Sequence, residues 1–489
     1  MASASSENKG NLAAGSVRLG TLIFHGISCL APAFCTVFIM PVMASAGGAS
    51  LVLAYIFATI ACIFTGLSLM QITKKIRSAG ALFPILTKAL GPSIGFVSAW
   101  LWILFGGATI GIGTIVLGQF VSEFFIAYYP TIPVPAWPVT LIGIFLYTFS
   151  CYSGIRLSAR LTMIFGGLEI GIIALLSLLL ISHAGTNQPT IVWTLDSSPI
   201  GIFGIIFASI FAMTCFIGFE ALIPLVEESY NAKRNLAIAI AVTIIAIGIF
   251  YIWTSYGIIA GVGAADPAAF GKEFSTNKGI MYQLADKAFG SLIGHWIILL
   301  AIFNSTTAGC IAVTNAVTRI YYSLGRAKVF PAWFSYISPK TQTPTNAIIF
   351  QGIISVIIAF GFQIWMMPWD VFVLIATSIT IAVLIIYVMV NISCYIYYRY
   401  HYPKEFNWIK HALFPFLGGL LMLLPLAASL VPQWIFGYYN EYPVNLAVYV
   451  IIVWLIAGIS LYLYVRATEP KAIQRLTNEM DTIKLAGEE

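Results

Sequence analysis

The chain has 489 residues, of which 60% are hydrophobic and only 9% are charged. Ordinary globular domains contain about 25% charged residues, so this composition excludes a water-soluble globular protein. It predicts an all-α polytopic membrane protein. The net charge of +6 needs no nucleic-acid partner, because it is explained by the positions of the basic residues along the chain.

Long apolar stretches recur from the first fifty residues to the last. A bilayer span needs about 20 mostly apolar residues. By this measure we predict twelve transmembrane helices, with no soluble domain between them. Their predicted ranges are 19–46, 50–73, 93–127, 138–156, 160–183, 200–224, 235–262, 289–325, 346–367, 370–398, 412–432 and 443–466.

The basic residues predict the orientation, because cytoplasmic loops are enriched in Lys and Arg. With the N-terminus inside, 21 of the 24 Lys and Arg fall in cytoplasmic segments, Arg319 among them. The other three, Lys272, Lys278 and Lys287, share one external loop with acidic residues. We therefore expect a protein of the cell membrane with a cytoplasmic N-terminal segment (1–18) and a cytoplasmic C-terminal tail (467–489). The first span is expected to act as its own insertion signal.

The sequence contains no nucleotide-binding, metal-binding or nucleophile–base pattern typical of an enzyme. All seven cysteines lie in or at the edge of a predicted span, and none forms a CxxC pair. The glycine cluster FGGATIGIG (105–113) lies within a span with no preceding strand, so close helix packing explains it better than phosphate binding. We predict no cofactor, no metal and no catalytic residue, and therefore no enzyme.

Two predicted spans carry helix-breaking residues at depth. The first span reads LIFHGISCLAPAFCTVFIMP and contains Pro32; the sixth reads FASIFAMTCFIGFEALIPLVEE and contains Gly218 and Pro224. A proline removes a backbone hydrogen bond, which a membrane tolerates where the backbone lines a cavity or packs within protein. Corresponding interruptions in two halves of a chain point to the central site of a transporter. The frequent occurrence of Gly and Pro in membrane helices is the alternative explanation.

The two interrupted spans lie five helices apart and so cross the membrane in opposite directions. This is the pattern of an inverted repeat, with residues 19–183 as the first repeat and 200–398 as the second. The last two spans, within 412–466, are then peripheral.

Two carboxylates, Glu169 and Glu220, lie within predicted spans. A lone carboxylate near mid-depth costs roughly 2–4 kcal/mol unless something compensates it. We expect both to take part in coupling or gating; the alternative is a carboxyl hydrogen-bonded to a neighbouring helix. Glu123 falls near the external end of its span, where it reaches water. Glu227 and Glu228 lie at a cytoplasmic exit, where a solvated gate or a salt bridge is expected.

Other polar residues at depth are fewer. His25 and His295 lie near helix starts and are expected to be ordinary hydrogen-bonded histidines. The strip FNSTTAGCIAVTN offers Ser305 and Thr306 as possible ion ligands, although hydroxyl residues also mediate helix packing. No Lys or Arg lies in the middle of a predicted span. Such an acidic or neutral core suits a cation or a zwitterion better than a bare anion.

Four stretches resemble motifs of the amino acid–polyamine–organocation (APC) transporter superfamily. They are GFEALIPLVEESYNAKRNLAIAI (218–240), RSAGALFPILTKALGPSIGFVSAW (77–100), GIRLSARLTMI (154–164) and TRIYYSLGRAKVFPAWFSYISPKTQTPTNAI (318–348). Their order and spacing resemble the superfamily over about residues 18–400. The resemblance implies a leucine-transporter-like fold of ten core helices in two inverted five-helix repeats, with two peripheral helices.

The resemblance also implies where the substrate binds. It places a small molecule between the unwound middles of the first and sixth helices, about Ala31–Thr36 and Met213–Gly218, with Glu220 in coupling or gating. The implied substrate-binding residues are Ala31, Ala33, Phe34, Cys35, Thr36, Gly106, Ile110, Met213, Thr214, Cys215, Phe216 and Gly218.

Two positions depart from the family pattern. Glu169 falls where many relatives carry a lysine, which points to proton titration or cation binding in its place. Many relatives also have a G-S/T-G motif at the first break, whereas this chain has APAFCT, in which Pro32 has no N–H and Phe34 narrows the space. The amides of Cys35 and Thr36 are then the ones left for a substrate carboxylate.

We therefore expect a proton-coupled secondary active transporter that moves an amino acid or a related amine by alternating access. The acidic core and the missing glycines keep a polyamine or inorganic cation carrier, for example for potassium, as an alternative. A non-transporting nutrient sensor is a more remote alternative, because such a protein would need a larger cytoplasmic region to signal.

Overall fold

The computed structural model describes residues 15, 17–76, 82–263, 267–277, 279–430, 442–472 and 475. Within these residues the regular structure is helical, apart from an isolated bridge between Val17 and Ser229. The α-helices are α1 (Leu19–Cys29), α2 (Pro32–Phe34), α3 (Met40–Gly47), α4 (Leu51–Thr73), α5 (Leu82–Leu90), α6 (Pro92–Tyr128), α7 (Ala136–Tyr152), α8 (Ile155–Ala184), α9 (Ile202–Thr214), α10 (Ala232–Val262), α11 (Pro267–Thr276), α12 (Ile280–Phe289), α13 (Gly294–Arg326), α14 (Thr345–Gly361), α15 (Pro368–His401), α16 (Phe414–Leu430) and α18 (Ala447–Thr468).

Shorter helical segments join or extend these helices. The π-helical segments are η1 (Cys35–Ile39) and η8 (Ile409–Leu413). The 3₁₀ segments are η2 (Gly48–Ser50), η3 (Thr190–Trp193), η4 (Phe219–Glu228), η5 (Ala332–Ser335), η6 (Phe362–Ile364), η7 (Pro403–Glu405) and η9 (Val444–Leu446).

Ten stretches of the described chain are long and apolar enough to cross a membrane. The first of them, Leu19–Thr73, contains all the helices from α1 to α4, and α7 is a shorter apolar helix of 17 residues. Proline at the first helical position begins both α6 and α15, where its missing N–H costs nothing. The prediction of an all-α polytopic architecture is confirmed.

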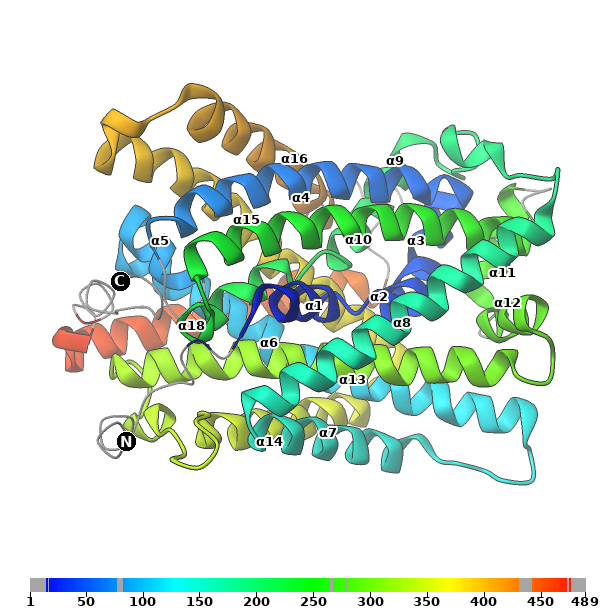
Figure 1. Ribbon diagram of the computed structural model, residues 1–489, viewed down its shortest axis with the longest axis horizontal. Coiled ribbons are helices and arrows are strands. Elements are labelled where there is room, and N and C mark those ends of the chain that lie inside the picture. Colours follow the sequence, from blue (N-terminus) through cyan, green and yellow to red (C-terminus); the bar gives the residue numbers. More distant parts are fainter. Residues whose placement is uncertain are drawn as a thin grey trace, which may run out of the picture.

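The helices form an inner and an outer set. The apolar windows of α6 and α15 are each 89% buried within the protein, whereas that of α18 is only 22% buried. Figure 1 shows α4 and α10 running side by side along the long axis, with α1 and α2 at the centre of the molecule and α8 crossing α13 obliquely. The elements with the polar residues of interest therefore lie in the middle of the bundle.

Three helices occupy segments that were expected to be loops. α5 lies between the second and third predicted spans, and α11 and α12 lie between the seventh and eighth. Figure 1 places α5 near one end of the long axis and α11 and α12 at the opposite end. These helices mark the two ends of the bundle.

Candidate functional site

The first helix is interrupted between α1 and α2. α1 ends at Cys29, and Ala31 adopts a left-handed conformation with φ 44° and ψ 64°. Pro32 prevents the helix from continuing, because it has no N–H and its ring clashes with the carbonyl four residues earlier. Since proline favours the first position of a helix, helical geometry resumes at Pro32 itself. The break is thus at Leu30 and Ala31, narrower than the predicted Ala31–Thr36.

The second interruption separates α9 from η4. α9 ends at Thr214, and a turn runs from Cys215 to Gly218 before η4 begins. Gly218 has a φ of 126°, which only glycine adopts without strain. A Cβ added there would lie 3.1 Å from both the Cβ and the carbonyl oxygen of Cys29. The two breaks therefore touch one another, as the sequence predicts for a central site.

Tyr251 of α10 joins the two breaks. Its hydroxyl lies 3.2 Å from the carbonyl oxygen of Leu30 and 3.1 Å from that of Cys215, and it is placed to donate to either. A hydroxyl has one proton, so the two carbonyls share it. The Tyr251 ring stacks on that of Tyr55 from α4, with 5.1 Å between centroids, and the Tyr55 hydroxyl lies 3.8 Å from the Cys215 sulfur.

Glu220 holds the second break to two of the innermost helices. It lies in η4 and is fully buried. Its Oε2 accepts hydrogen bonds from the Gly218 N–H at 3.1 Å and from the Tyr387 hydroxyl of α15 at 2.6 Å, while its Oε1 accepts one from the Trp102 indole of α6 at 3.3 Å. Three donors around one carboxyl group suit the ionised form, which only accepts hydrogen bonds.

Glu169 reaches the first break from α8. It too is fully buried, and its Oε2 accepts a hydrogen bond from the Ala33 N–H at 3.1 Å. The next amide, that of Phe34, donates to the hydroxyl of Ser305 from α13 at 3.0 Å. No hydrogen bond from the described residues reaches Glu169 Oε1. The two carboxylates singled out from the sequence thus each bind a backbone amide at one of the two breaks.

The other predicted residues are not all at the breaks. Met213, Cys215 and Phe216 are buried at the end of α9 and in the following turn, and Thr214 faces Thr380 of α15 with 2.5 Å between hydroxyl oxygens. Ile110, in contrast, packs with Tyr147, Cys151, Cys310, Ile311 and Ile348, a small cluster separate from the main core.

The remaining predicted residues make local contacts. Gly106 lies against Val317 and Trp102, so its lack of a side chain permits close packing of α6 on α13. The Cys35 thiol donates to the Leu30 carbonyl at 3.3 Å, and the hydroxyls of Thr36 and Thr306 donate to carbonyls of their own helical segments.

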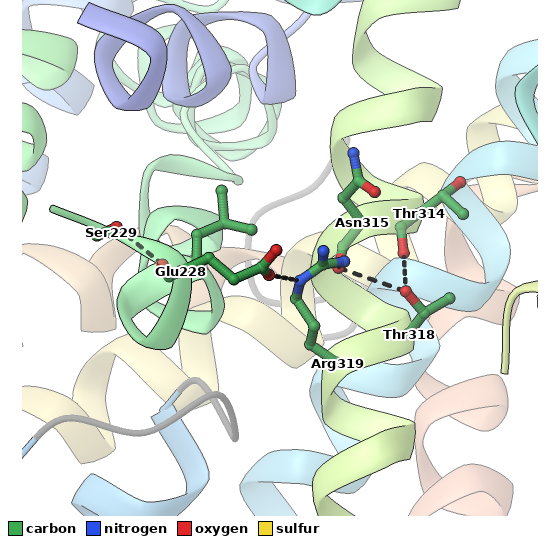
Figure 2. Close-up of polar contacts among 7 residues, drawn as sticks. Glu228, Ser229, Thr314, Asn315, Thr318 and Arg319 are labelled. Atoms are coloured by element: carbon green, nitrogen blue, oxygen red, sulfur yellow. Dashed lines mark hydrogen bonds and ion pairs between the residues drawn. The ribbon is translucent and has the colours of Figure 1, made fainter. Parts of the chain in front are cut away.

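A buried ion pair lies where the chain leaves η4. Arg319 of α13 donates from Nε to Glu228 Oε1 at 2.5 Å, and neither side chain is exposed to solvent. Figure 2 shows the two side chains pointing toward one another across the gap between η4 and α13. Beside them, the Val17 N–H donates to the Glu228 carbonyl at 3.0 Å, and the Tyr230 N–H to the Val17 carbonyl at 2.9 Å.

This arrangement corrects two predictions. Arg319 was counted among the basic residues of cytoplasmic segments, but its side chain is fully buried within α13 and not solvated. Of the two expected outcomes for Glu228, the solvated gate is wrong and the salt bridge is confirmed. Both corrections have the same physical cause, because burying two opposite charges as a hydrogen-bonded pair offsets part of their desolvation. The side chain of Glu227 lies outside the described part of the structure.

A cavity of about 250 Å³ lies toward the α11 and α12 end of the bundle. Its polar lining residues are Gln119, Glu123 and Asn277, and its aromatic lining residues are Phe38, Phe120, Phe274 and Trp369. The ring of Phe34, next to the first break, meets Phe38 at 5.0 Å and Phe372 at 5.8 Å between centroids. The rings of Phe34 and Phe38 therefore lie between this cavity and the first break.

The two histidines differ. The His295 ring nitrogen Nδ1 lies 2.9 Å from Asp286 Oδ1, so the expected ordinary hydrogen-bonded histidine is confirmed there. His25 is buried in α1, and neither ring nitrogen has a hydrogen-bond partner among the described residues, so the same expectation is wrong for His25.

Four aromatic side chains at the site were not predicted: Tyr55, Trp102, Tyr251 and Tyr387. Each comes from a helix that reads as uniformly apolar, and its partner is at least 36 residues away in sequence. A buried Tyr or Trp usually needs a hydrogen-bond partner, which is the one signal that could have marked them.

Comparison with known proteins agrees with this geometry. A family model for amino acid permeases matches residues 22–474. The chain is 30% identical over 326 residues to the low-affinity putrescine importer PlaP of Escherichia coli K12, an alignment that covers 64% of this chain and 67% of the importer.

Two further relatives are more distant. The branched-chain amino acid permease BcaP of Bacillus subtilis is 24% identical, over 64% of this chain and 67% of the permease. The mitochondrial cationic amino acid transporter 3 of Arabidopsis thaliana is 22% identical, over 64% of this chain and 52%, about half, of the plant protein. Since the family model covers nearly the whole length, the chain belongs to the amino acid permease family of the APC superfamily, and it is a multi-pass membrane transporter rather than an enzyme.

Proposed function

We propose that this protein is a proton-coupled secondary active transporter that carries an amino acid or a related amine across the cell membrane by alternating access. The observation that carries the proposal is the position of Glu220. This buried carboxyl group is bound at once to the backbone of the second break, to α6 and to α15.

Protonation of Glu220 would change how the broken helix is held. The ionised carboxyl group accepts all three hydrogen bonds, whereas a protonated one has a hydroxyl that must itself donate. At least one of the bonds from Gly218, Trp102 and Tyr387 would then weaken. A proton on Glu220 would thereby loosen the second break from α6 or α15, which is the kind of two-state element that coupling requires.

The topology proposed here has twelve spans in a leucine-transporter-like fold. The stretch Leu19–Thr73 would make two passes, one through α1 to α3 and one through α4, and α7 would add another to the ten long stretches. Residues 19–183 and 200–398 would form the inverted repeats, each beginning with a broken helix, and 412–466 the peripheral pair. Basic residues gather near the α5 end, which supports cytoplasmic termini on that side.

This orientation assigns the ion pair and the cavity to opposite sides of the membrane. The Arg319–Glu228 ion pair and the strand-like contact of Val17 close the cytoplasmic side, whereas the cavity with Gln119 and Glu123 lies toward the outside. The conformation would therefore be one that is closed inward, with an external vestibule above an aromatic layer. Alternating access would then require the buried ion pair to separate.

Uptake by reconstituted proteoliposomes tests the proposal. Labelled putrescine, leucine and arginine are suitable substrates, because relatives of this chain are a putrescine importer, a branched-chain amino acid permease and a cationic amino acid transporter. We expect an inward proton gradient to accelerate uptake of at least one of them. Glu220→Gln and Glu169→Gln should abolish that acceleration, while Glu273→Gln, which neutralises an exposed carboxylate of α11, should not. Uptake indifferent to the gradient and to both variants would rule out proton coupling.

A further inference from the structure

The amides that follow the first break are already occupied by the protein. The helical segment from Pro32 to Gly47 begins with a residue that has no N–H. The next three amides donate to Glu169 Oε2 at 3.1 Å, to Ser305 Oγ at 3.0 Å and to the Ala31 carbonyl at 2.9 Å. The first N–H groups of a helix are ordinarily unpaired and attract carboxylates. At this helix start the carboxylate that they attract is a side chain of the protein.

The charges buried in the bundle also disfavour a carboxylate on the substrate. The fully buried acidic and basic side chains of the described residues are Glu169, Glu220, Glu228 and Arg319. Arg319 is bonded to Glu228, so Glu169 and Glu220 remain as the carboxyl groups at the breaks. A carboxylate on the substrate would therefore meet two like groups, with no unpaired buried guanidinium or ammonium of the described chain to balance it.

The ends of the two half-helices favour a cation. α1 and α9 both end at the breaks, and the carbonyl end of a helix carries partial negative charge. The carbonyl oxygens of Leu30 and Cys215 lie here. Ala31 at the first break, Phe34 just after it and Thr214 at the end of α9 are each partly exposed rather than buried. An ammonium group fits this surrounding.

We propose that Glu169 is a built-in carboxylate. From α8 it takes the place at the first break that the carboxylate of an amino acid would need, and it thereby makes the transporter selective for amines without a carboxylate over the corresponding amino acids. Ser305 completes this function by occupying the neighbouring amide. The inference rests on the proposed transport function and narrows its substrate to primary amines and diamines.

Matched pairs of substrates test the selectivity of the unaltered protein. Putrescine and ornithine differ only by a carboxylate, as do cadaverine and lysine, and 3-methylbutylamine and leucine. We expect at least one amine to be taken up by proteoliposomes, and its amino acid partner to compete with it at least tenfold more weakly. Equal competition by the two members of every pair that binds would overturn the inference while leaving transport intact.

Variants of Glu169 test its role directly. Glu169→Ala removes the side chain from the Ala33 amide, so the amine preference should fall at least tenfold as the amino acid gains access. Millimolar formate or acetate should restore the preference in this variant by filling the vacated place. Glu169→Gln keeps an oxygen that can accept from the Ala33 N–H, so it should still exclude the amino acid while binding the amine more weakly. A residue that only supports the fold would weaken both members of a pair alike.

Ser305 offers a second test that does not alter charge. Ser305→Ala frees the Phe34 amide. It should lower the preference for the amine over its amino acid partner a few-fold, in the same direction as Glu169→Ala; this preference is the ratio compared below. Ser177→Ala is the matched control, because Ser177 donates only within α8 to the Ile173 carbonyl at 2.9 Å; it should leave the ratio unchanged. An unchanged ratio in both Glu169→Ala and Ser305→Ala would overturn the inference. Uptake of no member of any pair, with no thermal stabilisation by any, would instead remove the proposed transport function and this inference with it.

Discussion

Arg319 of α13 and Glu228 of η4 form an ion pair of 2.5 Å in which neither side chain reaches solvent. The pair joins the end of the second broken helix to α13. Removing one partner leaves the other charged and buried, which costs about 3–5 kcal/mol, whereas replacing both with apolar residues is often neutral.

This predicts a characteristic pattern in a double-mutant cycle. Arg319→Met and Glu228→Leu should each lower the apparent unfolding temperature of the purified protein strongly, and the double variant should recover most of the loss. The apparent melting temperatures of the unaltered protein, the two single variants and the double variant, all in one detergent, measure this coupling. Losses that simply add would mean that the two charges are not paired.

Removing the Tyr251 hydroxyl should loosen the contact between the two breaks. Tyr251→Phe takes a donor away from the Leu30 and Cys215 carbonyls and should cost about 1–2 kcal/mol of stability, with a larger loss of uptake than the stability change explains. Tyr256→Phe, on the same helix, is the control, because it loses one hydrogen bond to Gln188 away from the breaks. The idea fails if both variants lose stability and uptake to the same degree.

Gly218 should tolerate no side chain. Alanine there would have to adopt a φ of 126° and would approach Cys29 to 3.1 Å, so we expect Gly218→Ala to destabilise the protein by about 1–3 kcal/mol and to abolish uptake. Gly171→Ala in α8 meets no atom within 4 Å and should stabilise its helix by about 0.5–1 kcal/mol. Thermal unfolding of the two alanine variants compares their stabilities directly. A Gly218→Ala variant as stable as the unaltered protein would contradict the positive φ at this position.

The direction of the cavity can be tested by thiol labelling. Gln119 lines the cavity and is partly exposed, whereas all seven native cysteines are buried. Gln119→Cys should therefore react with a membrane-impermeant maleimide added to intact cells, and Ser229→Cys, buried beside Val17, should not. Labelling of Gln119→Cys only in inside-out vesicles would reverse the proposed orientation.

The breaks and the two carboxylates were predictable because their signals are local. Pro32 and Gly218 are residues that weaken or end a helix through their own backbone chemistry, and a carboxylate within an apolar run is conspicuous in the sequence. The predicted break ended at Thr36, five residues beyond its observed end at Ala31, since Pro32 begins a helix as well as it ends one.

The partners of these residues were not predictable, because they come from distant helices. Tyr387 and Glu220 are separated by 167 residues, and Tyr251 and Leu30 by 221. The burial of Arg319 was missed for a related reason: the rule that assigns basic residues to cytoplasmic loops uses only position along the chain. This rule contains no information about a carboxylate on another helix that can pair with the basic residue.

The shared proton of Tyr251 has a consequence for the binding of an amine. Two carbonyl oxygens, one from each half of the chain, share the single Tyr251 hydrogen, and the Leu30 carbonyl also accepts from the Cys35 thiol. A primary ammonium group brings three hydrogens. An amine that supplied one of them to either carbonyl would leave Tyr251 free to bond fully to the other, and a single small cation would in this way complete the junction between the two halves.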